Sequence, residues 1–373
     1  MKQKTKHISK KDSSTSVSSV SMSVAEPPSI INKKGKNYVY FGDNNLYPYY
    51  LVGLYESSPT HGAIINGKVK YIVGRGLFSE DEATDNLLQI ANKNESWSQV
   101  LFKLAMDYEI HNRYYIEVVR RRGGGKSYYH LDASRVRVDD EEQVWYYSDD
   151  WRKDGRHNSR PNTVKFIKYD AKRIKPITDG DVEYRELIPY EEYRPNFESY
   201  AYPNYMNVLL SIEAEAEISN YDLNQWKNGF LGSAILNFNS GEPDTEEAKT
   251  AIEKTVKDTI GGSGGKKILI NYSDNKDNAA TITGAKGEDS ATEADMASKR
   301  ISRTIFTGHT ITSPTLLGVM NESAFSGNAE LSEAYELFKE TYIVFRQKTL
   351  ITSIENAIGI DGVEIEELRK IKK

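Results

Sequence analysis

The sequence contains no cysteine, and this absence excludes several kinds of chemistry. Without a thiol there is no disulfide scaffold, no thiolate nucleophile and no Cys-ligated metal or iron–sulfur site. A chain without cysteine fits a reducing compartment. No run approaches the ~18 consecutive apolar residues of a membrane span, and the Lys/Ser-rich start lacks the apolar segment of a signal peptide. We therefore expect a protein that is neither secreted nor embedded in a membrane.

Motifs of catalysis and cofactor binding are also lacking. The six histidines show no close metal-ligand spacing, and there is no Gly-x-Ser-x-Gly elbow. A glycine-rich run ends in Lys266-Lys267 but lacks P-loop spacing, because Ile260 stands where the first glycine belongs and Lys267 where the Ser or Thr belongs. We therefore expect the glycine-rich run to be a flexible turn. For the whole chain we expect no cofactor and no enzymatic activity.

One acidic cluster leaves an enzymatic alternative open. Asp139-Asp140-Glu141-Glu142 offers the carboxylates that hard divalent cations prefer. Adjacent residues of a strand point to opposite faces, which favours a solvated turn instead. The rival hypothesis is a metal-dependent nucleic-acid-processing enzyme that uses Asp139 and Asp140.

Charge is distributed unevenly along the 373 residues. The chain carries 49 Lys and Arg against 54 Asp and Glu, a formal net charge of -5. Residues 1–36 hold eight Lys, two acids and nine Ser, which predicts a flexible basic tail. The remaining 41 bases and 52 acids make the body about 11 charges negative, and tight nucleic-acid binding needs clustered Lys and Arg instead. If DNA is involved, we expect it to slide past this body.

Hydrophobic periodicity predicts an α+β fold with alternating helices and strands in the first half of the chain. The predicted helices are 48–55, 61–73, 82–92 and 97–111, and the predicted strands are 114–121, 127–130 and others within 136–147. Residues 150–202, rich in Tyr, Asp, Arg and Pro, are interpreted as irregular strands and loops of a contact surface. The 25 tyrosines could stack on nucleotide bases, but subunit interfaces are favoured for them.

The second half contains two long helices that flank a small insert. One helix is predicted over 203–226, with Leu209, Ile212, Ala216 and Leu223 on its packed stripe. Ser290 and Glu293 have capping-box spacing at the start of the second helix, which runs to about Phe306. The insert between them is predicted as β-α-β-β, with strands 233–239, 267–272 and 279–283 around a helix at 245–259.

A polar loop then leads to one long helix that ends near Gly359. Its apolar residues recur every three to four positions, at Leu331, Tyr335, Phe338, Tyr342 and Phe345. Residues 363–373 are predicted as a short amphipathic helical tail. A monomeric binding module is a third hypothesis, in which one subunit covers the stripe 331–345 by itself.

This order of parts, together with several local sequences, resembles bacteriophage portal proteins. The segments that resemble the start of the portal wing are Tyr47-Pro48-Tyr49-Tyr50-Leu51, Ser57-Ser58-Pro59-Thr60-His61 and Tyr71-Ile72-Val73-Gly74-Arg75-Gly76-Leu77. Those that resemble the portal tunnel-loop region are Thr312-Ser313-Pro314-Thr315-Leu316-Leu317-Gly318 and Asn321-Glu322-Ser323-Ala324-Phe325-Ser326-Gly327. The resemblance covers residues 38–360, and the short remainder implies a minimal crown.

The resemblance implies a multi-domain subunit with an α/β wing, a two-helix stem, a β-α-β-β clip and a long spine helix. The expected divisions are a tail at 1–36, wing at 37–202, first stem helix at 203–230, clip at 231–287, second stem helix at 288–307, tunnel-loop region at 308–330, and long helix with minimal crown at 331–373. The implied assembly is a homo-oligomeric ring, usually a dodecamer, at the capsid vertex of a virion, assembled in the host cytoplasm. The ring admits and releases viral double-stranded DNA.

The resemblance also supplies partners and candidate residues. The partners are the major capsid protein, the terminase large subunit, a head-tail adaptor and DNA bound without sequence specificity; no membrane is involved. The candidate DNA-channel residues are Asn321, Ser323, Ser326, Asn328, Lys299, Arg300 and Arg303. Lys266 and Lys267 are the candidate clip residues for contact with terminase or adaptor. The basic residues could equally be solvated or form salt bridges to a neighbouring subunit.

Overall fold

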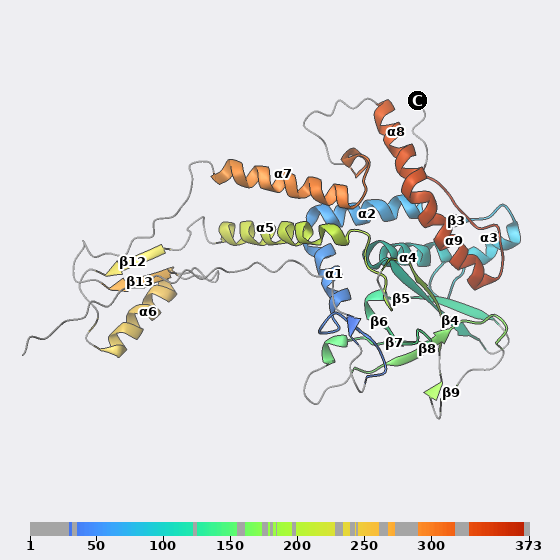
Figure 1. The fold of residues 1–373 in the computed structure, drawn as a ribbon, viewed down its shortest axis with the longest axis horizontal. Helices are drawn as coiled ribbons and strands as arrows, with labels where there is room; N and C mark the ends of the chain where they lie inside the picture. The colour runs from blue at the N-terminus through green and yellow to red at the C-terminus, as the bar shows by residue number, and fades with distance from the viewer. Residues whose placement is uncertain are drawn as a thin grey trace, which may run out of the picture.

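The computed structural model has an α+β body from which a pair of helices projects (Figure 1). It describes residues 30–31, 36–121, 125–154, 161–173, 178–179, 182–183, 185–195, 199–227, 234–238, 243, 245–260, 268–272, 290–317 and 328–368. The predicted 1–36 tail lies almost wholly outside these residues, although β1 (Ile30–Ile31) pairs with β2 (Tyr40–Phe41). None of the described helices combines the length and apolar character needed to cross a membrane.

The body is built on a six-stranded sheet in the order β5-β4-β11-β8-β7-β6. Its strands are β4 (Arg113–Arg120), β5 (Lys126–Leu131), β6 (Val136–Val138), β7 (Val144–Tyr147), β8 (Val164–Lys168) and β11 (Arg185–Glu191). The predicted β4–β5 hairpin is confirmed as an antiparallel pair, whereas β11 and β8 run parallel. A further short pair is formed by β9 (Thr178–Asp179) and β10 (Val182–Glu183).

Both faces of the sheet are buried, and this corrects the interpretation of residues 150–202. Along β4, Tyr114 packs in the helix-covered core, while Tyr115 packs in a second core on the other face, because successive side chains alternate. The second core includes Tyr200 and Tyr202, and Trp151 is fully buried in a third. Many of the tyrosines therefore fill the interior of one chain, where their rings supply a large apolar area.

Helices cover one face of this sheet. α4 (Trp97–His111) packs directly on β4 and β5, and α1 (Tyr47–Ser57) and α2 (Pro59–Val73) pack on α4. α3 (Glu82–Leu88) lies beside the short strand β3 (Leu77–Phe78). The sequence predicted all four, although α3 ends earlier than expected. A capping box between Ser96 and Gln99 starts α4, whose Val100, Leu101 and Leu104 side chains are fully buried.

The projecting pair consists of α5 (Leu209–Lys227), preceded by the 3-10 turn η3 (Met206–Val208), and α7 (Ser290–Gly308). Between them in the chain come β12 (Ala234–Phe238), α6 (Glu246–Ile260) and β13 (Ile268–Tyr272), at the far end of the pair (Figure 1). β12 and β13 pair in parallel, giving a β-α-β unit. The predicted strand 279–283 lies outside the described residues.

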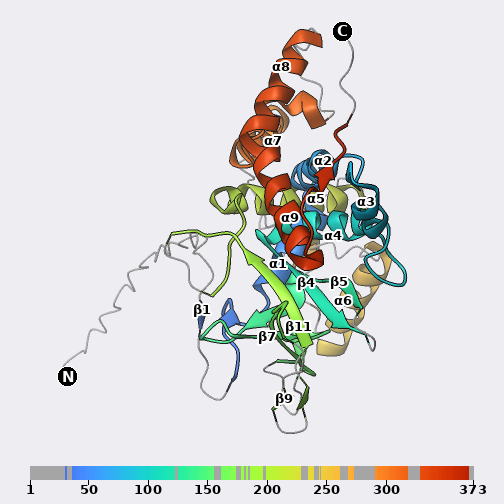
Figure 2. The same cartoon turned by 90° about the vertical axis from the view of Figure 1, so that its right-hand side faces the viewer.

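The long C-terminal helix contains a π-helical turn that the sequence pattern did not predict. α8 (Asn328–Phe338) continues through η6 (Lys339–Ile343), which is π-helical, into α9 (Val344–Ile358). A π turn inserts a residue, so the inward-facing positions change from the predicted Phe345 to Arg346, Leu350 and Ile354. Phe345 is 56% exposed, which contradicts its place in the predicted stripe. Figure 2 shows α9 lying across the body and α8 extending beyond it.

The sequence predicted the end of the long helix correctly, but not the structure of the segment after it. Gly359 ends α9 with a φ of 76°, the left-handed conformation that glycine adopts at low cost, as expected. Residues 364–365 form β14 (Glu364–Ile365), which pairs with β3 (Leu77–Phe78). The predicted amphipathic helix is therefore wrong here, because Val363 and Ile365 bury alternate side chains as a strand does.

Candidate functional site: a projecting helix pair and its anchor

Helices α5 and α7 are antiparallel, and two contacts fix their register. Ser302 on α7 donates its hydroxyl to Glu215 on α5 at 3.2 Å. Nearer the body, a Cβ built on Gly308 would lie 2.3 Å from a methyl of Val208, so only glycine permits this approach. The second contact joins the last residue of α7 to the 3-10 turn that precedes α5, where both helices meet the body.

Glu215 joins the helix pair to the body. Its Oε2 atom accepts the hydroxyl of Ser58 and, at 3.0 Å, the backbone N–H of Thr60, while its Oε1 accepts the Thr60 hydroxyl at 2.5 Å. Ser58 is the N-cap residue of α2. A carboxylate at a helix N-terminus is stabilised by unpaired N–H groups and the helix dipole. One carboxylate therefore ties together α2, α5 and α7.

A buried pair of imidazoles lies at the same junction. His61 Nδ1 and His309 Nε2 are 2.8 Å apart, and the ring of Tyr205 packs against both. Burial, with a smaller contribution from the charge of Lys68, lowers the pKa of His61 to about 3. Burial likewise lowers the pKa of His309 well below its ordinary value. Both rings are therefore neutral near pH 7.

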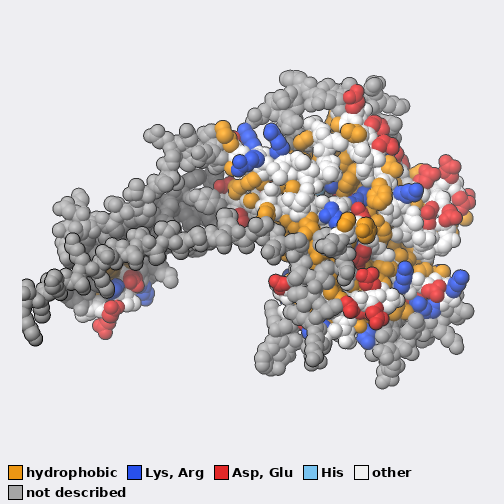
Figure 3. Space-filling model, in the orientation of Figure 1, with side chains coloured by type: hydrophobic (Ala, Val, Ile, Leu, Met, Phe, Trp, Pro, Cys, Tyr) orange, Lys and Arg blue, Asp and Glu red, His pale blue; other side chains and the backbone are white. Residues whose placement is uncertain are grey.

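The structure places the basic candidates of α7 together on its outer side. Lys299, Arg300 and Arg303 are exposed, whereas Ile305 on the same helix is fully buried. Lys299 pairs with Asp295 one turn away, at 3.1 Å. Figure 3 shows Lys and Arg side chains gathered on the side of α7 away from α5. The three residues thus form one basic surface.

The other candidates lie mostly outside the described residues. This applies to Lys266, Lys267, Asn321, Ser323 and Ser326. Asn328 is the first residue of α8. The predicted stripe of α5 is correct for Leu209, Ile212 and Ala216, but Leu223 is 50% exposed.

The acidic cluster forms the turn between β6 and β7. Asp139 Oδ1 accepts the backbone N–H groups of Gln143 at 2.8 Å and of Val144 at 3.0 Å. This carboxylate holds the turn closed, as short polar side chains commonly do. In the described segments, no group of three or more acidic or histidine side chains has the geometry to hold a metal ion. The observed contacts therefore give Asp139 a structural role.

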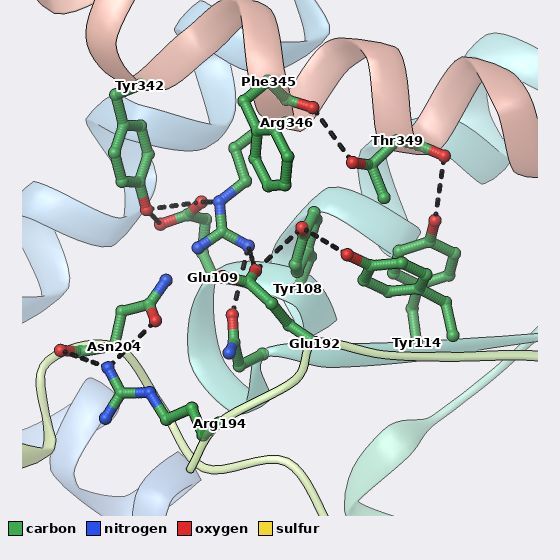
Figure 4. Close-up of polar contacts among 12 residues, drawn as sticks. Tyr108, Glu109, Tyr114, Glu192, Arg194, Asn204, Tyr342, Phe345, Arg346 and Thr349 are labelled. Carbon is green, nitrogen blue, oxygen red and sulfur yellow. Dashed lines mark hydrogen bonds and ion pairs between the residues drawn. The ribbon is translucent and has the colours of Figure 1, made fainter.

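A second buried cluster joins the long helix to the body (Figure 4). The Arg346 guanidinium donates to Glu192 at 2.6 Å and to Asn112 Oδ1 at 3.1 Å. It also lies 3.7 Å from the Glu109 carboxylate, and the side chains of Arg346 and Glu109 are only 3% and 2% exposed. Buried charges of this kind persist only when they are paired.

Tyr342, which lies within the π turn, also belongs to this cluster. Its hydroxyl donates to Glu109 at 2.7 Å, and Lys68 Nζ donates to the same hydroxyl at 2.9 Å. Lys68 also lies 3.5 Å from Glu109. Burial lowers the pKa of Lys68 to about 8, against the opposing effect of the Glu109 charge. Two cations and two carboxylates therefore balance within one buried network.

Sequence reasoning did not identify either cluster. Glu215 is one of three acids on its helix, and no local pattern distinguishes it from Glu213 and Glu217. The Ser58-Pro59-Thr60 segment carries an N-cap signature, which could have indicated a helix start in need of an acidic partner. His61 and His309 are 248 residues apart, and nothing in their local sequence signals their contact.

Comparison with solved structures shows the fold shared with gene transfer agent (GTA) particles. A chain from "Neck of empty GTA particle computed with C6 symmetry" aligns with a TM-score of 0.51 and 12% identity, over 86% of this chain and 83% of that one. A chain from "Virion of native gene transfer agent (GTA) particle" aligns with a TM-score of 0.52 and 13% identity over the same shares. No protein-family model and no curated protein matches the sequence. The likeness of fold agrees with the portal resemblance found in the sequence.

Proposed function

We propose that this chain is the subunit of a portal ring, the channel through which double-stranded DNA enters and leaves a viral-type capsid. The observation that carries the proposal is the shared fold, over 86% of the chain, with neck and virion chains of GTA particles. The neck was computed with sixfold symmetry, which supports a symmetric ring, and the portal resemblance implies a dodecamer. The ring would occupy a capsid vertex of the virion after assembly in the host cytoplasm.

Within this proposal, the described elements take distinct roles. The sheet and helices of residues 37–202 form the wing, which contacts neighbouring subunits and the major capsid protein. α5 and α7 belong to the stem (203–230 and 288–307) and line the channel. Residues 231–287 form the clip, where Lys266 and Lys267 meet the terminase large subunit or a head-tail adaptor. Residues 308–330 form the tunnel-loop region, and 331–373 the spine helix with a minimal crown.

The charge distribution suits a channel that DNA crosses without being held. Clustered cations would bind phosphates tightly and retain a moving polyanion. The body outside the tail is net acidic, and the exposed bases of α7, Lys299, Arg300 and Arg303, form only a small patch on the proposed stem. The short polar side chains Asn321, Ser323, Ser326 and Asn328 would face DNA in the tunnel-loop region.

Native mass spectrometry and negative-stain imaging of the purified chain test this proposal. We expect a closed ring with a central hole wide enough for a DNA duplex of roughly 20 Å. A chain that stays monomeric at every concentration and salt tested would contradict the proposal. We further expect Lys299→Glu to lower the yield of DNA-filled particles, and normal yields would count against a channel role for Lys299.

A further inference from the structure

We infer that successive copies in the ring bind through opposite edges of the α5–α7 pair, with Arg300 and Arg303 of one copy against Glu213 and Glu217 of the next. We call Glu213 and Glu217 the acidic edge, and Arg300 and Arg303 the basic edge. This inference rests on the proposed ring. It is carried by the placement of the two edges on opposite sides of one helix pair and at matching heights.

The acidic edge of α5 points away from α7. Glu215 faces α7, because it accepts the hydroxyl of Ser302. Residues two positions apart on an α-helix point in directions about 200° apart. Glu213 and Glu217 each lie two positions from Glu215 and are exposed. In agreement, burial and, to a smaller degree, the charge of Glu213 raise the pKa of Tyr50 on α1. Helix α1 lies on the other side of α5 from α7 (Figure 1).

The basic edge of α7 points away from α5 by the same argument. Arg300 lies two positions from Ser302, which faces Glu215. Arg303 lies three positions after Arg300, about 60° from it around the helix and about 100° from Ser302. Both arginines are exposed, and Figure 3 shows the Lys and Arg side chains on the outer side of α7. The helix pair therefore presents negative charge on one side and positive charge on the other.

The charges of the two edges also lie at matching heights along the pair. The Ser302–Glu215 bond sets these two residues level, and the Val208–Gly308 contact agrees with this register to within one residue. Counting outward from that bond in antiparallel helices, Arg300 is level with Glu217. Arg303 lies within one residue, about 1.5 Å, of the level of Glu213.

A ring converts this arrangement into contacts between copies. In a cyclic, head-to-tail assembly each copy presents one side to its predecessor and the opposite side to its successor. If both helices line the channel, their outer edges face the neighbouring copies. Rotation about an axis parallel to the helices keeps every residue at its height, so Arg303 meets Glu213 and Arg300 meets Glu217.

The partners of these charges are absent from the described part of the chain. Within it, none of the four residues forms an ion pair, whereas Lys299 beside them does. Each edge also carries one exposed apolar side chain, Leu210 at 50% on the acidic edge and Met296 at 65% on the basic edge. DNA as the partner would satisfy the basic edge but repel the acidic one. A second copy satisfies both.

Charge exchange between the edges tests the inference. One variant, Arg300→Glu/Arg303→Glu, has two acidic edges, and a second, Glu213→Lys/Glu217→Lys, has two basic edges. Each variant by itself should need a roughly tenfold or higher protein concentration to bring half of its chains into rings. The reason is that two charge pairs at every interface between copies become repulsive. An equimolar mixture should restore rings in which the two variants alternate in equal number. The fourfold variant should form rings alone.

The control is Lys254→Glu/Lys348→Glu, which makes the same change in net charge as Arg300→Glu/Arg303→Glu at two exposed positions outside the wing and the stem. It should form rings as the wild type does, and circular dichroism should show that every variant is folded. Native mass spectrometry counts both variants in each ring. Wild-type rings together with unimpaired rings of both edge variants would overturn the inference and leave the portal proposal intact. Wild-type chains that form no ring would overturn both.

Discussion

The imidazoles of His61 and His309 share a hydrogen bond 2.8 Å long in the buried junction of α2 and α7. Within the described residues, the outer nitrogens, His61 Nε2 and His309 Nδ1, are buried without a hydrogen-bond partner. A proton added to this pair would therefore place an unsolvated charge near Lys68, whose own charge already disfavours it. The junction depends on neutral histidines.

Acid should therefore weaken the fold through this pair. The pKa of His61 is about 3 in the folded chain against an ordinary value of 6.5, so its stabilising contribution is complete above 6.5 and is lost as the pH falls toward 3. Because of this histidine, the free energy of unfolding should be about 2 kcal/mol lower at pH 5 than at neutral pH. Urea unfolding at pH 7 and pH 5 measures the loss. The double variant His61→Gln/His309→Gln should show a smaller difference, and an unchanged one would contradict the assignment.

Removal of the Glu215 carboxylate should loosen the helix pair. Glu215→Ala takes away the acceptor of three groups at the start of α2 and of Ser302 on α7. We expect the free energy of unfolding to fall by about 2 kcal/mol, because hydrogen bonds to charged groups are the stronger ones. Asp222→Ala, exposed on the same helix, should change it by less than about 0.5 kcal/mol. Equal effects in a denaturant titration would argue against the anchoring role.

Removal of either a positive or a negative charge from the buried cluster around Arg346 should destabilise the fold. Arg346→Met leaves Glu109 and Glu192 without a cation that contacts both, and we expect it to cost about 3–5 kcal/mol. The double variant Arg346→Met/Glu109→Gln should cost less than the two single changes added together, because it removes the uncompensated charge. Chemical unfolding of the four proteins gives the coupling energy. Additive effects would show that the two residues act independently.

The π turn should make one residue of the long helix dispensable. Deletion of Thr341, an exposed residue within the turn, would leave a regular α-helix in which Arg346, Leu350 and Ile354 keep their inward direction. Deletion of Lys348, exposed on α9, would instead rotate Leu350 and Ile354 by about 100° relative to Arg346. We expect the Lys348 deletion to cost more than about 4 kcal/mol, measured by thermal unfolding, and the Thr341 deletion to cost clearly less. Equal losses of stability would contradict the inferred register.

The sequence by itself determined the helices, the β4–β5 hairpin and the order of parts, because these depend on local signals. Periodicity defined α2 and α4, and Gly359 marked the end of α9. The likeness to portal proteins also came from local segments and their order. The absence of cysteine, and the acidity of the chain outside its tail, are properties of composition alone.

The tertiary structure decided which of these residues meet. Glu215, not Glu213 or Glu217, became the anchor because the α5–α7 register turned it toward Ser302 and the start of α2. Phe345 left the predicted stripe because one π turn shifts every later position, and no periodicity in the sequence marks that turn. Residues 150–202 entered the core because their strands found partners distant in the chain. Such pairings depend on long-range geometry, which local propensity does not encode.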